Sequence, residues 1–300
     1  MWSKAPKGLV IAGPTCTGKS ALAVELAKIL GAEVISCDSA QVYKGLDIGT
    51  AKITTDEMQG MSHHMIDVAT PDDKYDVGRF TREVNDILRV KEQENKPVIL
   101  VGGTGLYIDG VTKGLAELPA RDENIRAELS EYSSEKLMEM LTSLDSDSAE
   151  NIHISNRGRI IRAIEVCQLT GSRFSILSRQ NKKDNNYNFV KFALDMERSE
   201  LYRRTDTRVE QMMVAGLRAE TESLLEAYGE SFKALNIIGY REMIDNIENN
   251  LDIDETCELI QKNTRHYVKR QFTWFRNDDS YTWCDALDNP LKHMLNMLQI

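Results

Sequence analysis

The chain has 300 residues, of which 41% are hydrophobic and 28% charged, so it can form one large domain or two modest ones. No apolar run approaches the roughly 20 residues of a membrane span, and the first residues lack the apolar stretch of a signal peptide, which predicts a cytoplasmic protein without a membrane partner. Five scattered cysteines without a C-x-x-C pair argue against a zinc site or a disulfide framework.

The net charge of −10, taken alone, argues against a nucleic-acid partner. The charge is unevenly distributed, however, because basic side chains gather in residues 157–183 and 262–276. Phosphates are bound by local clusters of basic side chains, whatever the net charge of the protein, so these two stretches remain candidate RNA contacts.

Residues 13–20 fit the phosphate-loop pattern G-x-x-x-x-G-K-[S/T] at every fixed position. An apolar run over 9–12 precedes them as a buried strand would, and a helical pattern over 21–30 follows, with Gly31 placed to end it. A strand, a glycine-rich loop and a helix in this order point backbone N–H groups at an anion, which predicts a di- or triphosphate site. Its residues are Gly13, Pro14, Thr15, Cys16, Thr17, Gly18, Lys19 and Ser20. Lys19 would supply a point charge, and the Ser20 hydroxyl would bind Mg²⁺.

Alternating strands and helices over the first part of the chain predict a parallel sheet covered on both faces. The predicted strands are 9–12, 33–37 and 97–101, with a helix over 80–95. From about residue 115 to residue 184 the pattern predicts helices and no strands. These helices are 121–132, 134–144 with Ser134 as its cap, and 156–169 ended by Gly171.

A strand is predicted again over 188–196, followed by helices to about residue 276 and a last strand at 282–284. The fold class is therefore α/β, with a phosphate-loop core formed by residues 1–114 and 186–300 and a helical insertion at 115–185. The polar segment 181–188 is predicted to be a flexible joint.

Asp38 directly follows the second predicted strand, where ligands bind in sheets of this kind. Its carboxylate could accept a proton near the phosphate site, and a helix cap or an indirect magnesium contact is an equal alternative. The strand 97–101 is followed by Gly102 and not by the acid that an ordinary ATPase uses. The absence of this acid counts against a general NTPase.

Several basic residues admit two interpretations. Arg159 and Arg162 share one helical face, which would either grip RNA phosphates or lie in solvent near Glu165. Arg208, near Arg203 and Arg204, would either reach the diphosphate or belong to an exposed helix face.

A basic helical stripe of Lys262, Arg265 and Lys269 is a candidate phosphate track. Its neighbouring aromatic residues favour core packing over base stacking, and they are Tyr267, Phe272, Trp274 and Phe275. The His63-His64 pair favours a structural role over metal binding, since no third ligand is suitably spaced.

Six segments occur in a characteristic order: 13–20, 38–43, 47–52, 63–64, 102–107 and 239–241. With these motifs the chain resembles the tRNA dimethylallyltransferases, over nearly its whole length and most strongly in 9–110. The resemblance implies transfer of a dimethylallyl group from dimethylallyl diphosphate to the 6-amino group of adenosine 37, beside the anticodon, in tRNAs that read codons starting with U. It implies tRNA as a partner, Mg²⁺ as a cofactor and no stable protein partner.

The resemblance also implies site residues. Asp38, Thr104 and Lys19 would be catalytic, and the loop residues with Arg208 would bind the diphosphate. The tRNA-contacting positions would be Asp38, Ser39, Ala40, Gln41, Thr104, Arg126, Gly158, Arg159, Arg162, Gly239, Tyr240 and Arg241. The insertion would clamp the anticodon stem-loop. A phosphate-loop small-molecule kinase and a non-catalytic tRNA-binding module are the alternatives.

Overall fold

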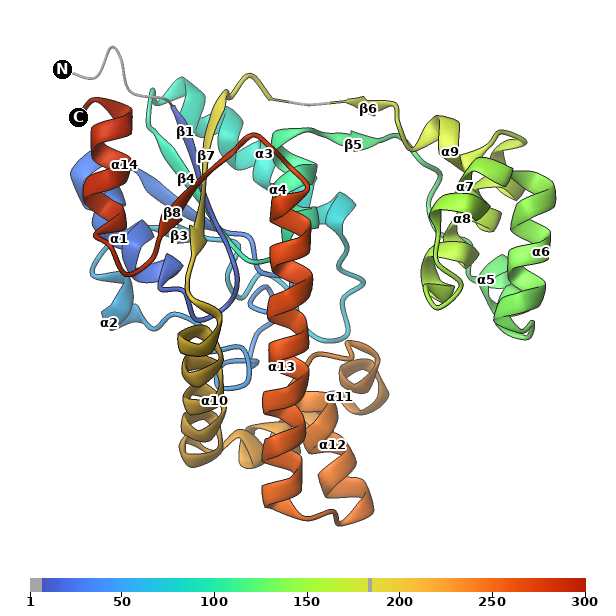
Figure 1. Ribbon diagram of the computed structural model, residues 1–300. Coiled ribbons are helices and arrows are strands. Elements are labelled where there is room, and N and C mark those ends of the chain that lie inside the picture. The colour runs from blue at the N-terminus through green and yellow to red at the C-terminus, as the bar shows by residue number, and fades with distance from the viewer. Residues whose placement is uncertain (1–6, 183–184) are drawn as a thin grey trace. The chain divides into compact units, whose positions relative to one another are not determined.

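The computed structural model describes residues 7–182 and 185–300 and divides into two compact units (Figure 1). The first unit runs up to residue 112 and resumes at 185, and the second spans 113–184. Lys183 of the basic stretch, and with it part of the predicted joint 181–188, lies outside the described residues.

The first unit is built on a six-stranded sheet whose paired strands are all parallel, in the order β3-β2-β4-β1-β7-β8. The strands are β1 (Gly8–Ala12), β2 (Glu33–Ser36), β3 (His63–His64), β4 (Val98–Gly102), β7 (Phe189–Asp195) and β8 (Tyr281–Asp285). β1 lies between β4 and β7, so the residues after it emerge from the middle of the sheet. The α/β fold class predicted from the sequence is confirmed.

Successive side chains of β1 enter two different cores, as the alternation of a strand requires. Leu9 and Ile11 pack in one cluster with helix α1 (Lys19–Leu30) and the partly buried side chains of α14 (Pro290–Leu298). Val10 and Ala12 pack in the other with α3 (Val77–Gln93) and α4 (Gly105–Thr112). The sheet is therefore covered on both faces, so a ligand would reach it at an edge.

A group of long helices follows β7 (Figure 1). They are α10 (Arg198–Ala215), α11 (Leu217–Ala234), α12 (Tyr240–Asn249) and α13 (Ile253–Arg276). α13 contacts α10, α12 and α4, and α4 in turn contacts β4 of the sheet. The short helix α2 (Thr55–Met58) completes the first unit. Within the described residues, no helix is long and apolar enough to cross a membrane.

The second unit is mainly helical and has its own apolar core. Its elements are β5 (Leu115–Ala116), α5 (Glu123–Ser130), α6 (Ser134–Leu144), α7 (Ser146–Asn151), α8 (Arg157–Thr170), α9 (Phe174–Leu177) and β6 (Asn181–Lys182). The prediction of no strands here is wrong, because β5 and β6 pair antiparallel. Ser134 is not the cap of α6 either, since the side chain of Ser133 accepts the amide of Lys136. Gly171 ends α8 in the left-handed conformation as predicted, and Gly31 ends α1 likewise.

Candidate active site

The phosphate loop connects β1 to α1, and local contacts hold its shape. The hydroxyl of Thr17 donates to the carbonyl oxygen of Pro14 at 2.9 Å, and Nζ of Lys19 donates to the same oxygen. Gly18 adopts a φ of 86° just before the helix, and a Cβ on Gly13, at φ 134°, would lie 2.8 Å from the carbonyl oxygen of Leu194. The two glycines therefore allow a turn that leaves the N-terminus of α1 open to an anion.

Lys19 is held in a position that favours an anionic ligand. Burial lowers the pKa of Lys19 from 10.5 to about 8, and the neighbouring charge of Arg208 lowers it too, against opposing effects of Cys16 and Asp38. A buried cation without full compensation is costly, and a bound phosphate would relieve that cost.

Arg208 of α10 joins two segments that are far apart in sequence. Its Nη1 donates to Oγ1 of Thr15 at 2.8 Å, and its Nη2 donates to the carbonyl oxygen of Thr50 at 3.0 Å. The side chain is half-buried. The exposed-face alternative for Arg208 is therefore wrong, whereas Arg203 is exposed and pairs with Glu200.

Asp38 lies just beyond the end of β2 and is half-buried. Its Oδ1 accepts the amides of Ala40 at 2.9 Å and Gln41 at 3.3 Å, so one oxygen holds the following turn. Thr104, after β4, accepts the amide of Ser39 at 3.0 Å through Oγ1, and its own amide donates to Cys37. The ends of two neighbouring strands thus fix the segment that carries the carboxylate.

Gly102, at the end of β4, has no room for a side chain. A Cβ there would lie 2.2 Å from the carbonyl oxygen of Cys37. An acid of the ATPase kind at this position would require the strands to move apart. The close contact gives a physical reason for the missing acid.

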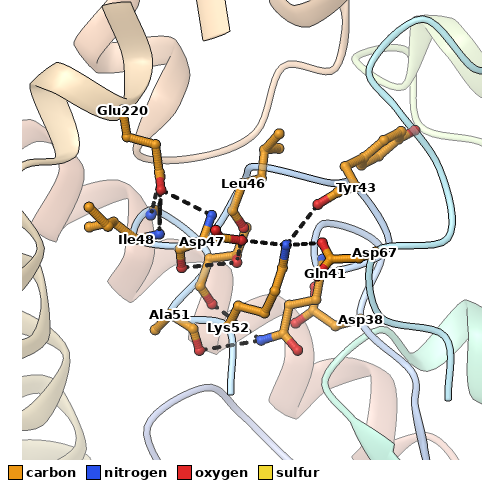
Figure 2. A network of polar contacts seen from close by, with 12 residues as sticks. Asp38, Gln41, Tyr43, Leu46, Asp47, Ile48, Ala51, Lys52, Asp67 and Glu220 are labelled. Carbon is orange, nitrogen blue, oxygen red and sulfur yellow. Dashed lines mark hydrogen bonds and ion pairs between the residues drawn. The ribbon is translucent and has the colours of Figure 1, made fainter. Parts of the chain in front are cut away.

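The turn Asp47–Gly49 is anchored by a carboxylate from helix α11 (Figure 2). Glu220 accepts the amides of Asp47 at 3.2 Å, Ile48 at 2.9 Å and Gly49 at 3.1 Å. The hydroxyl of Tyr240 also donates to Glu220 and accepts the amide of Gly49. Tyr240 is 1% exposed, so its side chain supports this turn from the interior of the protein.

Lys52 holds the other end of the segment 38–52 in place (Figure 2). Its Nζ donates to the carbonyl oxygen of Tyr43 at 2.8 Å and pairs with Asp47 at 2.6 Å and Asp67 at 2.5 Å. Nε2 of the Gln41 side chain donates to the carbonyl oxygen of Thr50 at 3.3 Å. Hydrogen bonds and ion pairs therefore hold residues 38–52 as one braced segment beside the phosphate loop.

A cavity of about 660 Å³ joins these parts, which is within the usual size for a small-ligand site. Lys19, Ser20 and Arg208 line it together with Asp38. Most of the predicted tRNA-contacting residues of the first unit line it too, namely Asp38, Ser39, Ala40, Gln41, Gly239 and Arg241.

Helix α13 contributes to the lining of this cavity. Tyr267 and Arg270 line it, and burial, with a smaller effect of the Asp38 charge, raises the pKa of Tyr267 to about 12. Phe275 is fully buried and Phe272 packs partly, in line with core packing, but Trp274 is 41% exposed. Arg265 of the basic stripe pairs with Asp206, while Lys262 and Lys269 are exposed.

Two of the predicted RNA contacts in the second unit are exposed, and two are held in ion pairs. Gly158 and Arg159 are the exposed residues. Arg162 pairs with the fully buried Glu165 at 2.7 Å and donates to the carbonyl oxygen of Pro119, and Arg126 reaches Glu165 at 3.5 Å. These two guanidinium groups compensate a buried carboxylate. Glu165 is therefore close to Arg162 as expected, but Arg162 does not lie on a solvent face as the alternative predicted.

The two histidines have structural partners. His64 bonds Glu33 at 2.6 Å, and His63 bonds the carbonyl oxygen of Met61 at 2.8 Å. Burial would raise the pKa of Glu33, but hydrogen bonds from Lys96, His64 and Lys91 lower it to about 2. Across the part of the chain that the structure describes, no group of three His, Cys, Asp or Glu side chains could hold a metal.

Sequence reasoning missed Glu220, Lys52 and Gln271 as site residues. Lys52 belongs to a segment that the motifs include, whereas Glu220 lies in an ordinary amphipathic helix pattern. Gln271 is a polar residue in a basic and aromatic stretch, and it is 4% exposed. Val268 and Phe275, three residues before it and four after it, lie on the same helical face, and a polar residue between them on that face is a signal that could have identified it.

An anion-binding loop, two cations and a carboxylate around one cavity define a phosphate-loop α/β protein built to bring a phosphorylated donor to a second group. A family model described as IPP transferase matches residues 41–278. The chain belongs to the IPP transferase family.

Named relatives agree with this membership. The chain is 47% identical over 277 residues to a tRNA dimethylallyltransferase of Fusobacterium nucleatum, covering 92% of this chain and 91% of that protein. It is 42% identical over 299 residues to one from Thermosipho melanesiensis, covering 98% of both.

Two solved structures are similar to this chain over nearly its whole length. A full-length tRNA isopentenylpyrophosphate transferase of Bacillus halodurans has a TM-score of 0.74 at 38% identity, covering 98% of this chain and 96% of that chain. A eukaryotic dimethylallyltransferase acting on tRNA has a TM-score of 0.81 at 25% identity, covering 96% of this chain and 77% of that chain.

Proposed function

We propose that the protein transfers the dimethylallyl group of dimethylallyl diphosphate to the 6-amino group of adenosine 37 in tRNAs that read codons starting with U, in the cytoplasm. The relatives named above are called tRNA dimethylallyltransferases, and these names include the transferred group and tRNA. One observation supports it from the site itself: Asp38 and the cations Lys19 and Arg208 line the same cavity.

Asp38 would act as the base in this reaction. An adenine amine is a poor nucleophile because its lone pair is delocalised into the ring. Oδ1 of Asp38 holds the turn through Ala40 and Gln41, and Oδ2 is the oxygen that would orient the amine and take its proton as the C–N bond forms. Extrusion of the base from its stack would bring the amine to this oxygen.

Lys19, Arg208 and the loop amides would stabilise the departing diphosphate. The allylic carbon gains positive character as its C–O bond breaks, so the charge that develops on the diphosphate must be held firmly. Each well-placed donor contributes on the order of 2–4 kcal/mol to such a step. Arg208 reaches Thr15 of the loop and Thr50 of the braced segment, which suits it to hold an anion between them.

The residues present fit a magnesium ion. Mg²⁺ prefers oxygen ligands and binds through few protein groups together with substrate phosphates. The exposed hydroxyl of Ser20 and the carboxylate of Asp38 line one cavity, and we propose that Ser20 would hold the ion. Bound there, Mg²⁺ would neutralise charge on the leaving diphosphate.

Residues 113–184 would grip the anticodon stem-loop. Their exposed cations support this role, because Arg159, Arg173 and Arg179 are open to solvent on helices α8 and α9 or just beside them. Phosphate contacts of this kind give affinity that falls with salt. Arg126 and Arg162 would act indirectly, by neutralising Glu165 and holding α5 to α8.

One assay tests the proposal. Undermodified tRNA is incubated with labelled dimethylallyl diphosphate and Mg²⁺, and label in the RNA is counted. Incorporation at adenosine 37 is the expected result. ATP turnover on a small acceptor with no labelled RNA would indicate a kinase, and tRNA binding with neither reaction would indicate a binding module.

A further inference from the structure

Gln271 of α13 joins the phosphate loop to the segment after β4. Its Oε1 accepts the amide of Thr15 at 3.0 Å, and its Nε2 donates to the carbonyl oxygen of Gly103 at 3.0 Å. Both ends of one buried amide are thus used, across 256 and 168 residues of sequence. A Cβ on Gly103 would lie 2.1 Å from Nε2, so the glycine is needed for the approach.

From Gly103 the contacts lead directly to the carboxylate. The next residue, Thr104, donates its amide to the carbonyl oxygen of Cys37 at 3.2 Å and accepts the amide of Ser39 at 3.0 Å. Asp38 lies between those two partners. A single side chain of α13 therefore links the loop that would hold the diphosphate to the residues that would hold the base.

Transfer of an allylic group depends on this spacing. The carbon leaves an oxygen held by one segment and joins an amine held by the other, and reacting atoms must lie about 3–3.5 Å apart. If the two segments separate, the cationic carbon forms before the amine is in reach. Water, which is small, can then react in its place.

We propose that Gln271 is a positioning residue that sets the distance between the diphosphate loop and the Asp38 segment, and so directs the allylic group to the amine and not to water. This inference rests on the proposed function. In the misdirected reaction the C1–O bond breaks with its electron pair on diphosphate, and a water oxygen bonds to C1. Its proton goes to Asp38 or solvent, which gives the allylic alcohol and diphosphate.

The test compares Gln271→Met and Gln271→Glu with the full-length wild-type protein. Methionine is similar in size and bridges neither partner, while glutamate keeps an acceptor for Thr15 and loses the donor to Gly103. The matched control is Gln261→Met on the same helix, whose side-chain amide makes long contacts, 3.4 Å to the carbonyl oxygen of Asp206 and 3.5 Å to Glu210. Diphosphate release and label in tRNA are measured together, with melting temperature and affinity for the donor.

We expect the ratio of diphosphate released to groups transferred to rise at least about fivefold in both Gln271 variants, and to stay near the wild-type value in the control. Folded variants with an unchanged ratio, whatever their rate or stability, would overturn the inference and leave the proposed function standing. A wild-type protein that transfers no label to tRNA overturns both.

Discussion

The hydroxyl of Tyr240 donates a hydrogen bond to the carboxylate of Glu220, and it accepts one from the amide of Gly49 at 3.1 Å. Tyr240 begins α12 and Glu220 lies in α11, so two helices jointly hold the turn at residues 47–49. A Cβ on Gly49 would lie 2.5 Å from the Tyr240 ring. Gly49 lines the cavity that also contains Asp38, whereas Tyr240 and Glu220, which hold its turn, are not among the lining residues of that cavity.

We predict that Glu220→Gln destabilises the protein and weakens use of tRNA. The carboxylate accepts three amides and a hydroxyl, and a carboxamide has one oxygen and brings two donors toward them. The free energy of unfolding should fall by about 2 kcal/mol, the usual scale for hydrogen bonds to a charged group. Urea unfolding measures it, with the half-exposed Glu222→Gln of the same helix as the control. Equal stability of the two variants would contradict the assigned anchor.

We predict that Lys19→Met stabilises the protein at pH 7 while it abolishes transfer. The pKa of Lys19 is about 8 in the folded protein, below its ordinary value of 10.5. The unfolded chain therefore binds the Lys19 proton more tightly than the folded protein does. The cost of the buried charge is therefore fully present below pH 8 and disappears as pH rises past 10.5. The gain in unfolding free energy should be about 3 kcal/mol at pH 7 and shrink toward pH 10.

The control for this experiment is Lys28→Met, an exposed lysine of the same helix. It should show no gain that depends on pH. Inorganic diphosphate should raise the melting temperature of the wild-type protein and leave the Lys19 variant nearly unchanged. A gain of equal size at pH 7 and pH 10 would argue that burial of the charge is not its cause.

We predict that Asp38→Asn lowers turnover at least about a hundredfold without loss of stability or tRNA affinity. Asparagine keeps an oxygen for the amides of Ala40 and Gln41, so the turn is preserved while proton acceptance is lost. Asp38→Ala should lose both turnover and stability. Single-turnover kinetics and gel-shift binding measure the two effects, with the exposed Asp86→Asn as the control. A near-normal rate for Asp38→Asn would falsify the base assignment.

We predict that Arg208→Lys raises the KM for dimethylallyl diphosphate about tenfold or more. One ammonium group cannot span Thr15 and Thr50 as the guanidinium fork does. Arg203→Lys, at an exposed position five residues earlier, is the matched control. Steady-state kinetics with the donor varied at saturating tRNA give the comparison, and similar KM values in both variants would remove Arg208 from the donor site.

The sequence by itself determined the local features. The octet 13–20, the apolar strand before it and the helix after it are set by neighbours in the chain, and these predictions are confirmed by β1, α1 and the αL glycine at 31. The same holds for β4 and for Gly171 after α8. A cap one residue away, at Ser133, was missed because adjacent serines satisfy the same local pattern.

Only the tertiary structure decided which distant side chains meet. Arg208 lies against the phosphate loop, Glu220 under the turn at 47–49, and Gln271 between two loops, each joined across more than a hundred residues. The pattern of a helix shows which face is polar, but it does not show which segment that face will reach. Such contacts arise when helices α10, α11 and α13 pack beside the sheet, because long-range packing and not local propensity brings their polar groups together.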